Sequence, residues 1–395
     1  MSALDDSGIA TSVIDPGGCH YLPQLLAVRL EERASVIAVL SRGGFKVRDA
    51  SRADLGRVTR DFPNGLPLGV LKIGDDPHRA ARYLASLDHP IASAPIHGVG
   101  YEGHGGFMSG DGPGPPVVNL TGPGTCRIEG MIAVIDSGIV KRSLRPDWMS
   151  SDYVDAEAVD IEAIAKGGAS HGTFVSSVIR KLAPGHGIAF AAARPDFAGR
   201  LTSHHEDAVV DPPTDELEVL GAVARLVRRF GGRPSEIVAL NLSLGATQCG
   251  ANDGFLLTLQ TALDMWRQAF GYDAPIFAAG GNSPSLEPVY PAAFPWVRAV
   301  AAADRKGRPV VWQQKVPQTP NPPRSWITDI APGVRIHGLS GVSKDDTVWW
   351  SGSSFATAIA TSQSVTGQPF EVDGAQTFWR DRTVDYGLIS GLEHS

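Results

Sequence analysis

The run Met131-Ile132-Ala133-Val134-Ile135 is apolar throughout and ends on the carboxylate of Asp136. Such a run is typical of a strand that is buried on both faces, as in a parallel sheet covered by helices. A carboxylate at the end of a buried strand is held in a fixed place. The run therefore favours a layered α/β fold with a polar group at a strand end.

The sequence after this run alternates between helical and extended patterns. Apolar spacing predicts helices over 215–230 and 254–270, and extended segments over 236–242, 275–279 and 297–302. This alternation predicts a doubly wound, mostly parallel sheet with helices on both faces. Catalytic groups in such a fold are expected at the strand ends.

Two further polar residues occur where a helix is expected to begin. His171 precedes a segment, 173–182, whose apolar residues recur at helical spacing, and Ser354 precedes the small-residue segment 355–360. A hydroxyl at a helix N-terminus lies in positive potential, which favours loss of its proton. An alcohol also needs an imidazole to accept that proton and a carboxylate to orient the imidazole. Asp136, His171 and Ser354 supply one group of each kind.

Five short segments carry a more specific pattern. They are 133–138 (Ala-Val-Ile-Asp-Ser-Gly), 170–175 (Ser-His-Gly-Thr-Phe-Val), 240–245 (Leu-Asn-Leu-Ser-Leu-Gly), 278–282 (Ala-Ala-Gly-Gly-Asn) and 352–356 (Gly-Ser-Ser-Phe-Ala). The chain order acid, base, nucleophile is the order found in subtilisin. Over roughly residues 128–365 the chain resembles the subtilisin-like (subtilase) serine proteases.

The resemblance implies a role for each of these residues. Ser354 would be the nucleophile, His171 the general base and then acid, Asp136 the group that orients the imidazole, and Asn282 a donor in the oxyanion hole. The implied substrate-binding residues are Ser243, Leu244 and Gly245, which would pair with an extended peptide, and Ala278, Ala279 and Gly280, which would lie beside the pocket for the residue before the cleaved bond. The implied function is a serine endopeptidase that works through an acyl-enzyme intermediate.

Other readings stay open. Taken singly, Asp136 could cap a turn, His171 could be a polar helix-terminal residue, Ser354 could be an N-cap and Asn282 a turn residue. The family usually has Thr and Pro where this chain has Ser353 and Ala358, and the polar segment 361–369 predicts that the helix behind Ser354 is cut short. These departures motivate the alternative of a catalytically silent peptide-binding module, and an esterase or acyltransferase is a further alternative.

The first hundred residues have a pattern of their own. Extended and helical segments over 20–101 follow a β-α-β-β-α-β order, which predicts a small α+β ferredoxin-like domain over 1–101. A Gly/Pro-rich linker over 102–127 would separate it from a catalytic domain over 128–395. This domain resembles the subtilase propeptide, which implies an intramolecular inhibitor and self-cleavage near 97–104. An unrelated α+β domain is the alternative.

Composition bounds the partners. The chain has 395 residues and a formal net charge of −7, with no dense basic cluster, so a nucleic-acid partner is not expected. Its cysteines, Cys19, Cys126 and Cys249, are too few and too scattered for a disulfide framework or a metal set. Neither a secretory signal nor an apolar stretch long enough to span a membrane is evident, so we expect a cytoplasmic protein without a membrane partner.

No cofactor is expected. Family members often carry calcium, but no Asp/Asn/Gly loop in this sequence predicts a site for it. The run His204-His205-Glu206-Asp207 could bind a metal ion, although adjacent side chains seldom face one ion and a solvated loop is the better reading.

Overall fold

The structure is a computed structural model of the 395-residue chain. It describes residues 13–14, 20–56, 58–99, 130–140, 145–149, 153–154, 171–193, 214–247, 256–282, 288–304, 307–313, 316–320, 326–339, 347–367 and 380–381. The sequence predictions for the linker, the three cysteines and the 204–207 run lie outside these residues.

An antiparallel sheet is formed by the N-terminal part of the chain. Its strands are β1 (Val13–Ile14), β2 (His20–Arg29), β3 (Val47–Asp49), β4 (Leu68–Ile73) and β5 (Ser93–Val99). The pairing order is β3-β4-β2-β5, with β1 also on β2. Its helices are η1 (Leu30–Glu32), α1 (Arg33–Arg42), α2 (Arg52–Leu55), α3 (Val58–Asp61) and α4 (Pro77–Ala85).

Local sequence sets two of these helix starts. Ser51 and Asp54 form a reciprocal capping box at α2. At α4, the side chain of Asp76 accepts a hydrogen bond from the backbone N–H of His78, and Pro77 occupies the first helical position. The strands and the long helices α1 and α4 follow one another in the order strand, helix, strand, strand, helix, strand.

The larger sheet has eight strands, in the order β20-β17-β14-β12-β10-β6-β8-β7. Every neighbouring pair from β17 to β7 is parallel, and β20 alone is antiparallel to its neighbour. The bounds are β6 (Gly130–Asp136), β7 (Tyr153–Val154), β8 (His186–Ala192), β10 (Ile237–Leu242), β12 (Ile276–Ala279), β14 (Arg298–Ala303), β17 (Asp329–Pro332) and β20 (Arg380–Asp381). The predicted mostly parallel α/β sheet is confirmed.

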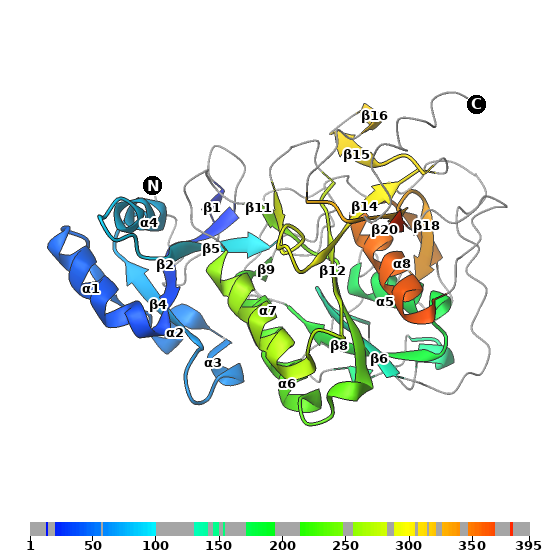
Figure 1. The fold of residues 1–395 in the computed structure, drawn as a ribbon, viewed down its shortest axis with the longest axis horizontal. Helices are drawn as coiled ribbons and strands as arrows, with labels where there is room; N and C mark the ends of the chain where they lie inside the picture. Colours follow the sequence, from blue (N-terminus) through cyan, green and yellow to red (C-terminus); the bar gives the residue numbers. More distant parts are fainter. Residues whose placement is uncertain are drawn as a thin grey trace.

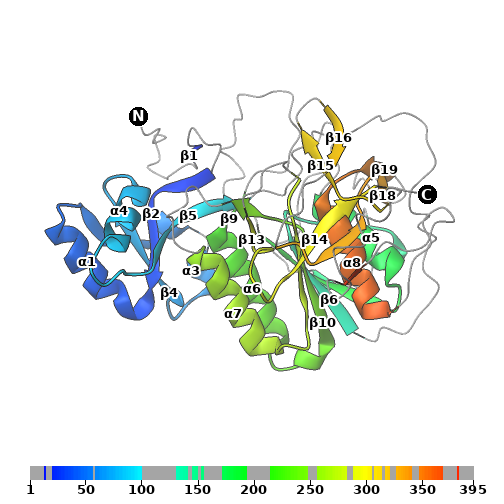
Figure 2. The same ribbon diagram turned by 45° about the horizontal axis from the view of Figure 1, so that its top comes forward.

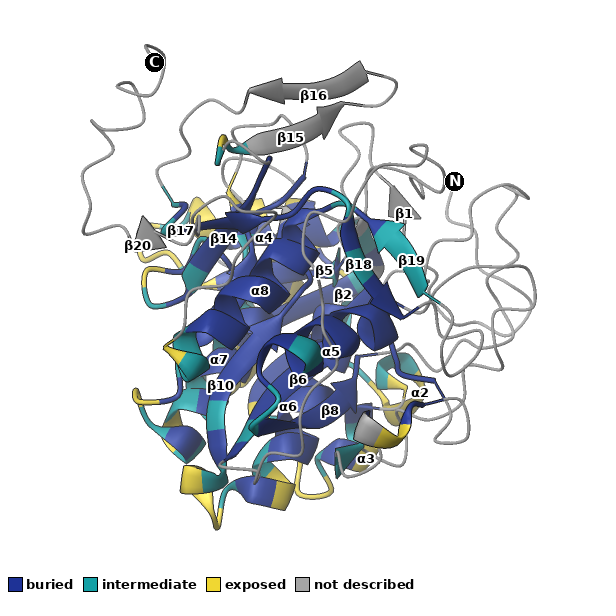
Figure 3. Cartoon of the chain, turned by 90° about the vertical axis from the view of Figure 1, so that its right-hand side faces the viewer, coloured by how far each residue is buried: buried dark blue, intermediate teal, exposed yellow. Residues whose placement is uncertain are grey.

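Helices cover both faces of this sheet (Figures 1 and 2). They are α5 (His171–Leu182) and α8 (Ser353–Thr366) on one face, and α6 (Glu216–Phe230) and α7 (Leu257–Phe270) on the other. Alternate residues of β6 feed the two cores, because Ala133 and Ile135 pack with α6 and α7 whereas Ile132 and Val134 pack with α5 and α8. Figure 3 shows α5 and α8 almost wholly buried against the sheet. The apolar run 131–135 is thus covered on both faces, as its composition predicts.

Smaller elements complete the described chain. They are the 3₁₀ turns η3 (Asp147–Met149) and η5 (Pro234–Glu236), the short strand β9 (Thr214–Asp215), and three antiparallel pairs: β11 (Ala246–Thr247) with β13 (Val289–Tyr290), β15 (Val310–Gln313) with β16 (Val316–Pro320), and β18 (Ile336–Leu339) with β19 (Thr347–Trp350). Strand β8 and the hairpins were not predicted from the sequence.

The N-terminal part is attached to α6 and α7, on the side away from the large sheet (Figure 1). Strand β5 pairs with β9, so the antiparallel sheet continues into the residues that precede α6. A buried ion pair joins Asp61 of α3 to Arg225 of α6 at 2.5 Å, and Arg225 also donates to the carbonyl of Ala192. Strands from the two sides of the predicted linker, β5 and β9, thus pair with each other. The strand pairing therefore does not define the boundary between the predicted domains 1–101 and 128–395.

Candidate active site

Asp136 is the last residue of β6 and is fully buried. Its Oδ1 accepts a hydrogen bond of 2.7 Å from the N–H of Ser137, and its carbonyl accepts one of 2.9 Å from Ala193. Strands β8 and β10 pair with β6 on its two sides. The carboxylate is therefore fixed by the centre of the sheet and by the turn that follows the strand.

His171 is the first residue of α5, and its ring faces this carboxylate. Nδ1 of His171 lies 2.8 Å from Oδ1 of Asp136. With a proton on Nδ1 donated to the carboxylate, Nε2 is the nitrogen left to act as a base. The next residue must be small, because a Cβ on Gly172 would lie 2.2 Å from the carbonyl oxygen of Gly138. The His-Gly pair thus lets the helix start approach the turn after β6.

Ser354 lies in the first turn of α8, which begins at Ser353 after Gly352. The ring of the following residue, Phe355, lies 5.5 Å from the ring of His171, measured between centroids. The Ser354 hydroxyl donates a hydrogen bond of 3.1 Å to the carbonyl of Ser243. The hydroxyl must therefore redirect its hydrogen from this carbonyl before it can donate to the imidazole, and catalytic hydrogen bonds of this kind are often formed only once substrate is bound.

A buried polar network holds Ser354 against β10. The hydroxyl of Ser243 is 2.8 Å from the carbonyl oxygen of Ser354 and 2.9 Å from Oδ1 of Asn241. The amide nitrogen of Asn241 in turn donates to the hydroxyl of Thr361 at 3.0 Å. Ser354 and Thr361, which lie about two turns apart on α8, are thus both tied to β10, the strand next to β6. Buried polar groups satisfied in this way make the core geometry specific.

The helix behind Ser354 is not cut short, which corrects the sequence expectation. It continues to Thr366 and ends at Gly367, whose φ of 63° is left-handed. The hydroxyls of Thr357, Thr361 and Ser362 each donate to the carbonyl four residues earlier. These bonds satisfy polar side chains inside the protein, so polarity after Ala360 did not require the helix to end. The main structural reason for the silent-module reading is thereby removed.

Asn282 lies beside the start of the same helix. Its Oδ1 accepts a hydrogen bond of 2.7 Å from the N–H of Ser353, and the side chain is 1% exposed. This bond fixes which way the amide faces, so that Nδ2 is kept as a donor. The N–H of Ser354 belongs to the first turn of α8, where amides have no acceptor within the helix. These two donors are the pair expected for an oxyanion hole.

We expect Asn282→Ala to lower kcat for peptide hydrolysis by about 100- to 1,000-fold with little change in KM. Nδ2 of Asn282 would donate to the oxyanion, which carries its charge in the transition state and not in the bound substrate. Steady-state kinetics on a peptide substrate checks this. Asn282→Asp keeps the acceptor for Ser353 but removes the donor, so it is expected to lose as much. An Asp variant with wild-type kcat would contradict the role.

The substrate-binding residues predicted from the resemblance are all buried. Ser243 and Leu244 have no exposed surface, and Gly245 leads directly into β11. The side chains of Ala278 and Ala279, in β12, are also fully buried, and Ala278 packs in the core with α6 and α7. A Cβ on Gly280 would lie 2.4 Å from Ile327. Residues 278–280 can therefore line a pocket only through their backbone, and their assignment to substrate binding stays a prediction.

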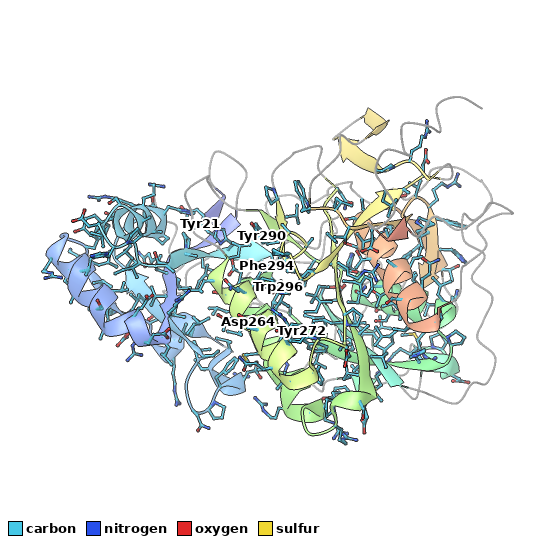
Figure 4. The ribbon with its side chains drawn as sticks, in the orientation of Figure 1. Tyr21, Asp264, Tyr272, Tyr290, Phe294 and Trp296 are labelled. Carbon is cyan, nitrogen blue, oxygen red and sulfur yellow. The ribbon has the colours of Figure 1, made fainter. Side chains whose placement is uncertain are left out.

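An aromatic row lies along α7, next to β11. Tyr290 pairs in strand register with Ala246, and its ring lies 5.0 Å from that of Phe294, which stacks on Trp296 at 5.2 Å. Figure 4 labels these three residues together with Asp264, in the middle of α7, and Tyr272, which follows the end of that helix. The guanidinium carbon of Arg267 in α7 lies 5.0 Å from the centroid of the Trp296 ring, so Trp296 packs against this helix.

Sequence reasoning missed a buried acidic site at the start of α6. Asp215 caps the helix by accepting hydrogen bonds from the N–H groups of Leu217 and Glu218. Glu216 faces β5, where its Oε1 lies 2.9 Å from Nδ1 of His97 and 3.1 Å from the backbone nitrogen of His97. The only sequence signal was the cluster Asp215-Glu216-Leu217-Glu218, which reads as an ordinary acidic helix start.

Burial raises the pKa of Asp215 to about 6, an effect that the two backbone hydrogen bonds oppose and the neighbouring Glu216 reinforces. A raised carboxyl pKa favours the folded state at low pH, and this contribution is lost as the pH rises from about 4 through 6. We expect Asp215→Asn, which keeps an N-cap acceptor, to raise the unfolding temperature by a few degrees at pH 8 and to leave it unchanged near pH 4. Thermal denaturation across this range checks it; a gain that persists at pH 4 would contradict it.

The described residues contain no group of three or more His, Cys, Asp or Glu side chains arranged to hold a metal ion. Among the same residues, no helix combines the length and apolar character that a membrane crossing requires.

Comparison with known proteins gives structural neighbours only. No protein-family model matches the sequence, and no curated protein is significantly similar to it. Similar solved structures include the prenylagaramide maturation protease PagA, with 20% identity, a TM-score of 0.42, and coverage of 61% of this chain and 78% of that one. The patellamide maturation protease PatA has 20% identity and a TM-score of 0.42, with coverage of 62% of this chain and 82% of that one. A Ser-to-Ala mutant of the epidermin leader peptide processing serine protease EpiP from Staphylococcus aureus is also similar. Its identity is 13% and its TM-score 0.48, and the match covers 86% of this chain and 87% of that one.

All three neighbours are below 25% identity and below a TM-score of 0.5. The assignment of the fold therefore rests on the strand order, the helix placement and the site geometry of this chain. Those features are a mostly parallel sheet with helices on both faces, an Asp–His pair at the end of the interior strand β6, and a serine at the start of a buried helix on the same face.

Proposed function

We propose that this chain is a serine endopeptidase with Asp136, His171 and Ser354 as its catalytic triad. The observation that carries the proposal is the 2.8 Å contact between Nδ1 of His171 and the buried carboxylate of Asp136, on the same face as the start of α8. A capped turn or a polar helix end accounts for either residue alone, but neither accounts for a buried Asp–His pair. The subtilase resemblance of the sequence agrees with this assignment.

The proposed reaction uses these groups in turn. Oγ of Ser354 attacks the carbonyl carbon of the scissile peptide bond while Nε2 of His171 takes its proton. The resulting oxyanion receives hydrogen bonds from Nδ2 of Asn282 and the N–H of Ser354. The imidazolium then gives its proton to the leaving amine, which leaves an acyl-enzyme. Water, activated by the same imidazole, hydrolyses the ester and restores the Ser354 hydroxyl.

The substrate would bind as an added strand. The placement of β5 supports this mode, because β5 pairs with β9 and lies near β11, the strand that follows Ser243, Leu244 and Gly245. Main-chain hydrogen bonds supply affinity in this mode of recognition, and alternate side chains supply specificity. We therefore propose that the N-terminal part of the chain is an intramolecular inhibitor, and that self-cleavage after β5 exposes the edge of β9 that β5 covers. Cellular location belongs to the same proposal: a processing protease that acts in the cytoplasm.

A fluorophosphonate probe followed by peptide mapping tests the proposal. We expect the probe to add to Ser354 in the wild-type chain, together with hydrolysis of unfolded protein substrates into fragments. Ester turnover without any peptide cleavage would instead favour the esterase reading. Absence of labelling, of peptide cleavage and of N-terminal trimming would favour the silent peptide-binding module.

A further inference from the structure

The strand that pairs with β9 places one side chain against a buried carboxylate. His97 of β5 and Glu216 of α6 both have no exposed surface. One carboxylate oxygen, Oε1, lies near both the backbone nitrogen and Nδ1 of His97, at 3.1 and 2.9 Å. The contact joins residues that are 119 positions apart in the chain, so it depends on the seating of β5 rather than on local sequence.

Helix capping does not explain the placement of Glu216. Asp215 performs the capping, and Glu216 makes no bond to a backbone N–H of its own helix among the described residues. Its second oxygen, Oε2, is buried, and no hydrogen-bond partner for it is found in the described part of the chain. His97 therefore contacts only one of the two carboxylate oxygens. A guanidinium or an ammonium group offers more donors and full charge to the same site.

Among the described residues, the groups nearest to this site are acidic or neutral, apart from two histidines. Asp215 and Glu218 flank Glu216 on α6, and Glu218 is 5% exposed. From the N-terminal part, the ring of His78 lies 6.2 Å from that of His97, and the ring of Tyr21 lies against His78. Of these groups only the two histidines can carry positive charge, so the net field favours a cation at the position of His97.

We infer that Glu216 is a specificity-determining residue that selects a basic side chain (Lys, Arg or His) in any extended segment that pairs with β9. In the structure this segment is β5, with Gly98 opposite Asp215 and Val99 opposite Thr214. In a substrate, the selected basic residue is the one that takes the place of His97, just before those paired positions. This inference rests on the proposed endopeptidase function and adds a substrate class to it.

Peptides with the sequence of residues 93–104 of this chain test the inference directly. The set differs only at the position of His97, which is His, Lys, Arg, Gln or Glu, and kcat/KM for each is measured with the full chain by mass spectrometry. We expect Lys and Arg to exceed Gln by about tenfold or more, the factor for one charge-assisted hydrogen bond, and Glu to fall below Gln. Glu216→Gln should remove the ranking, and Glu216→Lys should favour the Glu peptide.

A binding measurement keeps the two proposals separate. The measurement uses full-length protein that carries Ser354→Ala and His97→Glu. The new carboxylate at position 97 faces that of Glu216, and their repulsion weakens the pairing of β5 with β9. The edge of β9 is then open to a fluorescent peptide. We expect the Lys and Arg peptides to bind at least tenfold more tightly than the Gln peptide. Equal binding or equal cleavage of all five peptides would overturn the role of Glu216 and leave the protease intact. Preferential binding with no cleavage of any peptide by the His97→Glu variant that keeps Ser354 would support Glu216 and contradict the protease.

Discussion

Ser354→Ala is expected to lower kcat for peptide hydrolysis by at least about 10⁴-fold and to abolish labelling by a fluorophosphonate probe, because the variant lacks the proposed nucleophile that forms the acyl-enzyme. The fold should be unaffected. The hydroxyl contributes one hydrogen bond, to the carbonyl of Ser243, and the N-terminal turn of α8 keeps its other contacts. Intact mass and steady-state kinetics measure both effects. If self-cleavage occurs, the variant should also keep its full N-terminus.

Ser362→Ala is the matched control for this change. It removes a buried hydroxyl from the same helix, one that donates to the carbonyl of Ala358 in the last turns of α8. It should keep wild-type activity while showing a similar small effect on stability. Loss of activity in both variants would point to damage of the helix rather than to loss of the nucleophile. Peptide cleavage that survives Ser354→Ala would exclude the triad as proposed.

Asp136→Asn is expected to lower kcat by about 10⁴-fold while the folded structure is retained. The amide has the size of the carboxylate, and its oxygen can still accept from the N–H of Ser137. What is lost is the negative charge. Oδ1 contacts both the N–H of Ser137 and Nδ1 of His171, so an amide that keeps its oxygen there no longer stabilises the imidazolium, and one that turns its NH₂ there favours the wrong tautomer. The pH dependence of kcat and the circular dichroism spectrum, measured on both proteins, separate this effect from unfolding.

Asp329→Asn serves as the comparison for a buried carboxylate in the same sheet. Asp329 is fully buried in β17 and pairs with Arg298, away from the strand end that carries Asp136. The substitution is expected to cost stability, because the buried charge interaction between Asp329 and Arg298 is lost. It should leave kcat near the wild-type value. A large loss of kcat in the Asp329 variant alone would show that the sheet, and not the Asp136–His171 pair, limits the reaction.

The local sequence pattern was sufficient to predict a strand or helix where its apolar residues show which side is buried. The run 131–135 predicted a strand covered on both faces, and the apolar spacing after His171 predicted a helix that begins there. Both features depend on which residues avoid water, and this property can be read from sequence. Strand β8, His186–Ala192, has the same apolar character and was overlooked, although the signal was present.

The polar end of α8 shows where local pattern misleads. Thr361, Ser362, Gln363 and Thr366 suggested that the helix stops, yet it continues to Thr366. Each hydroxyl is satisfied by a carbonyl one turn earlier, and Thr361 also accepts from Asn241 of β10. The amide of Asn241 lies on a strand 120 residues away in the chain. Only the packed structure makes that partner available, so the polarity was misread as exposure.

The sequence by itself determined the chemistry that this chain can carry and the order in which the groups appear, because buried strands, helix starts and the identities of Asp136, His171 and Ser354 are local properties. The tertiary structure decided which distant groups meet. It joins His97 to Glu216 and Asn241 to Thr361, and it seats β5 beside β9. Such contacts depend on the packing of elements far apart in the chain, and a carboxylate such as Glu216 looks the same in sequence whether it caps a helix or holds a ligand.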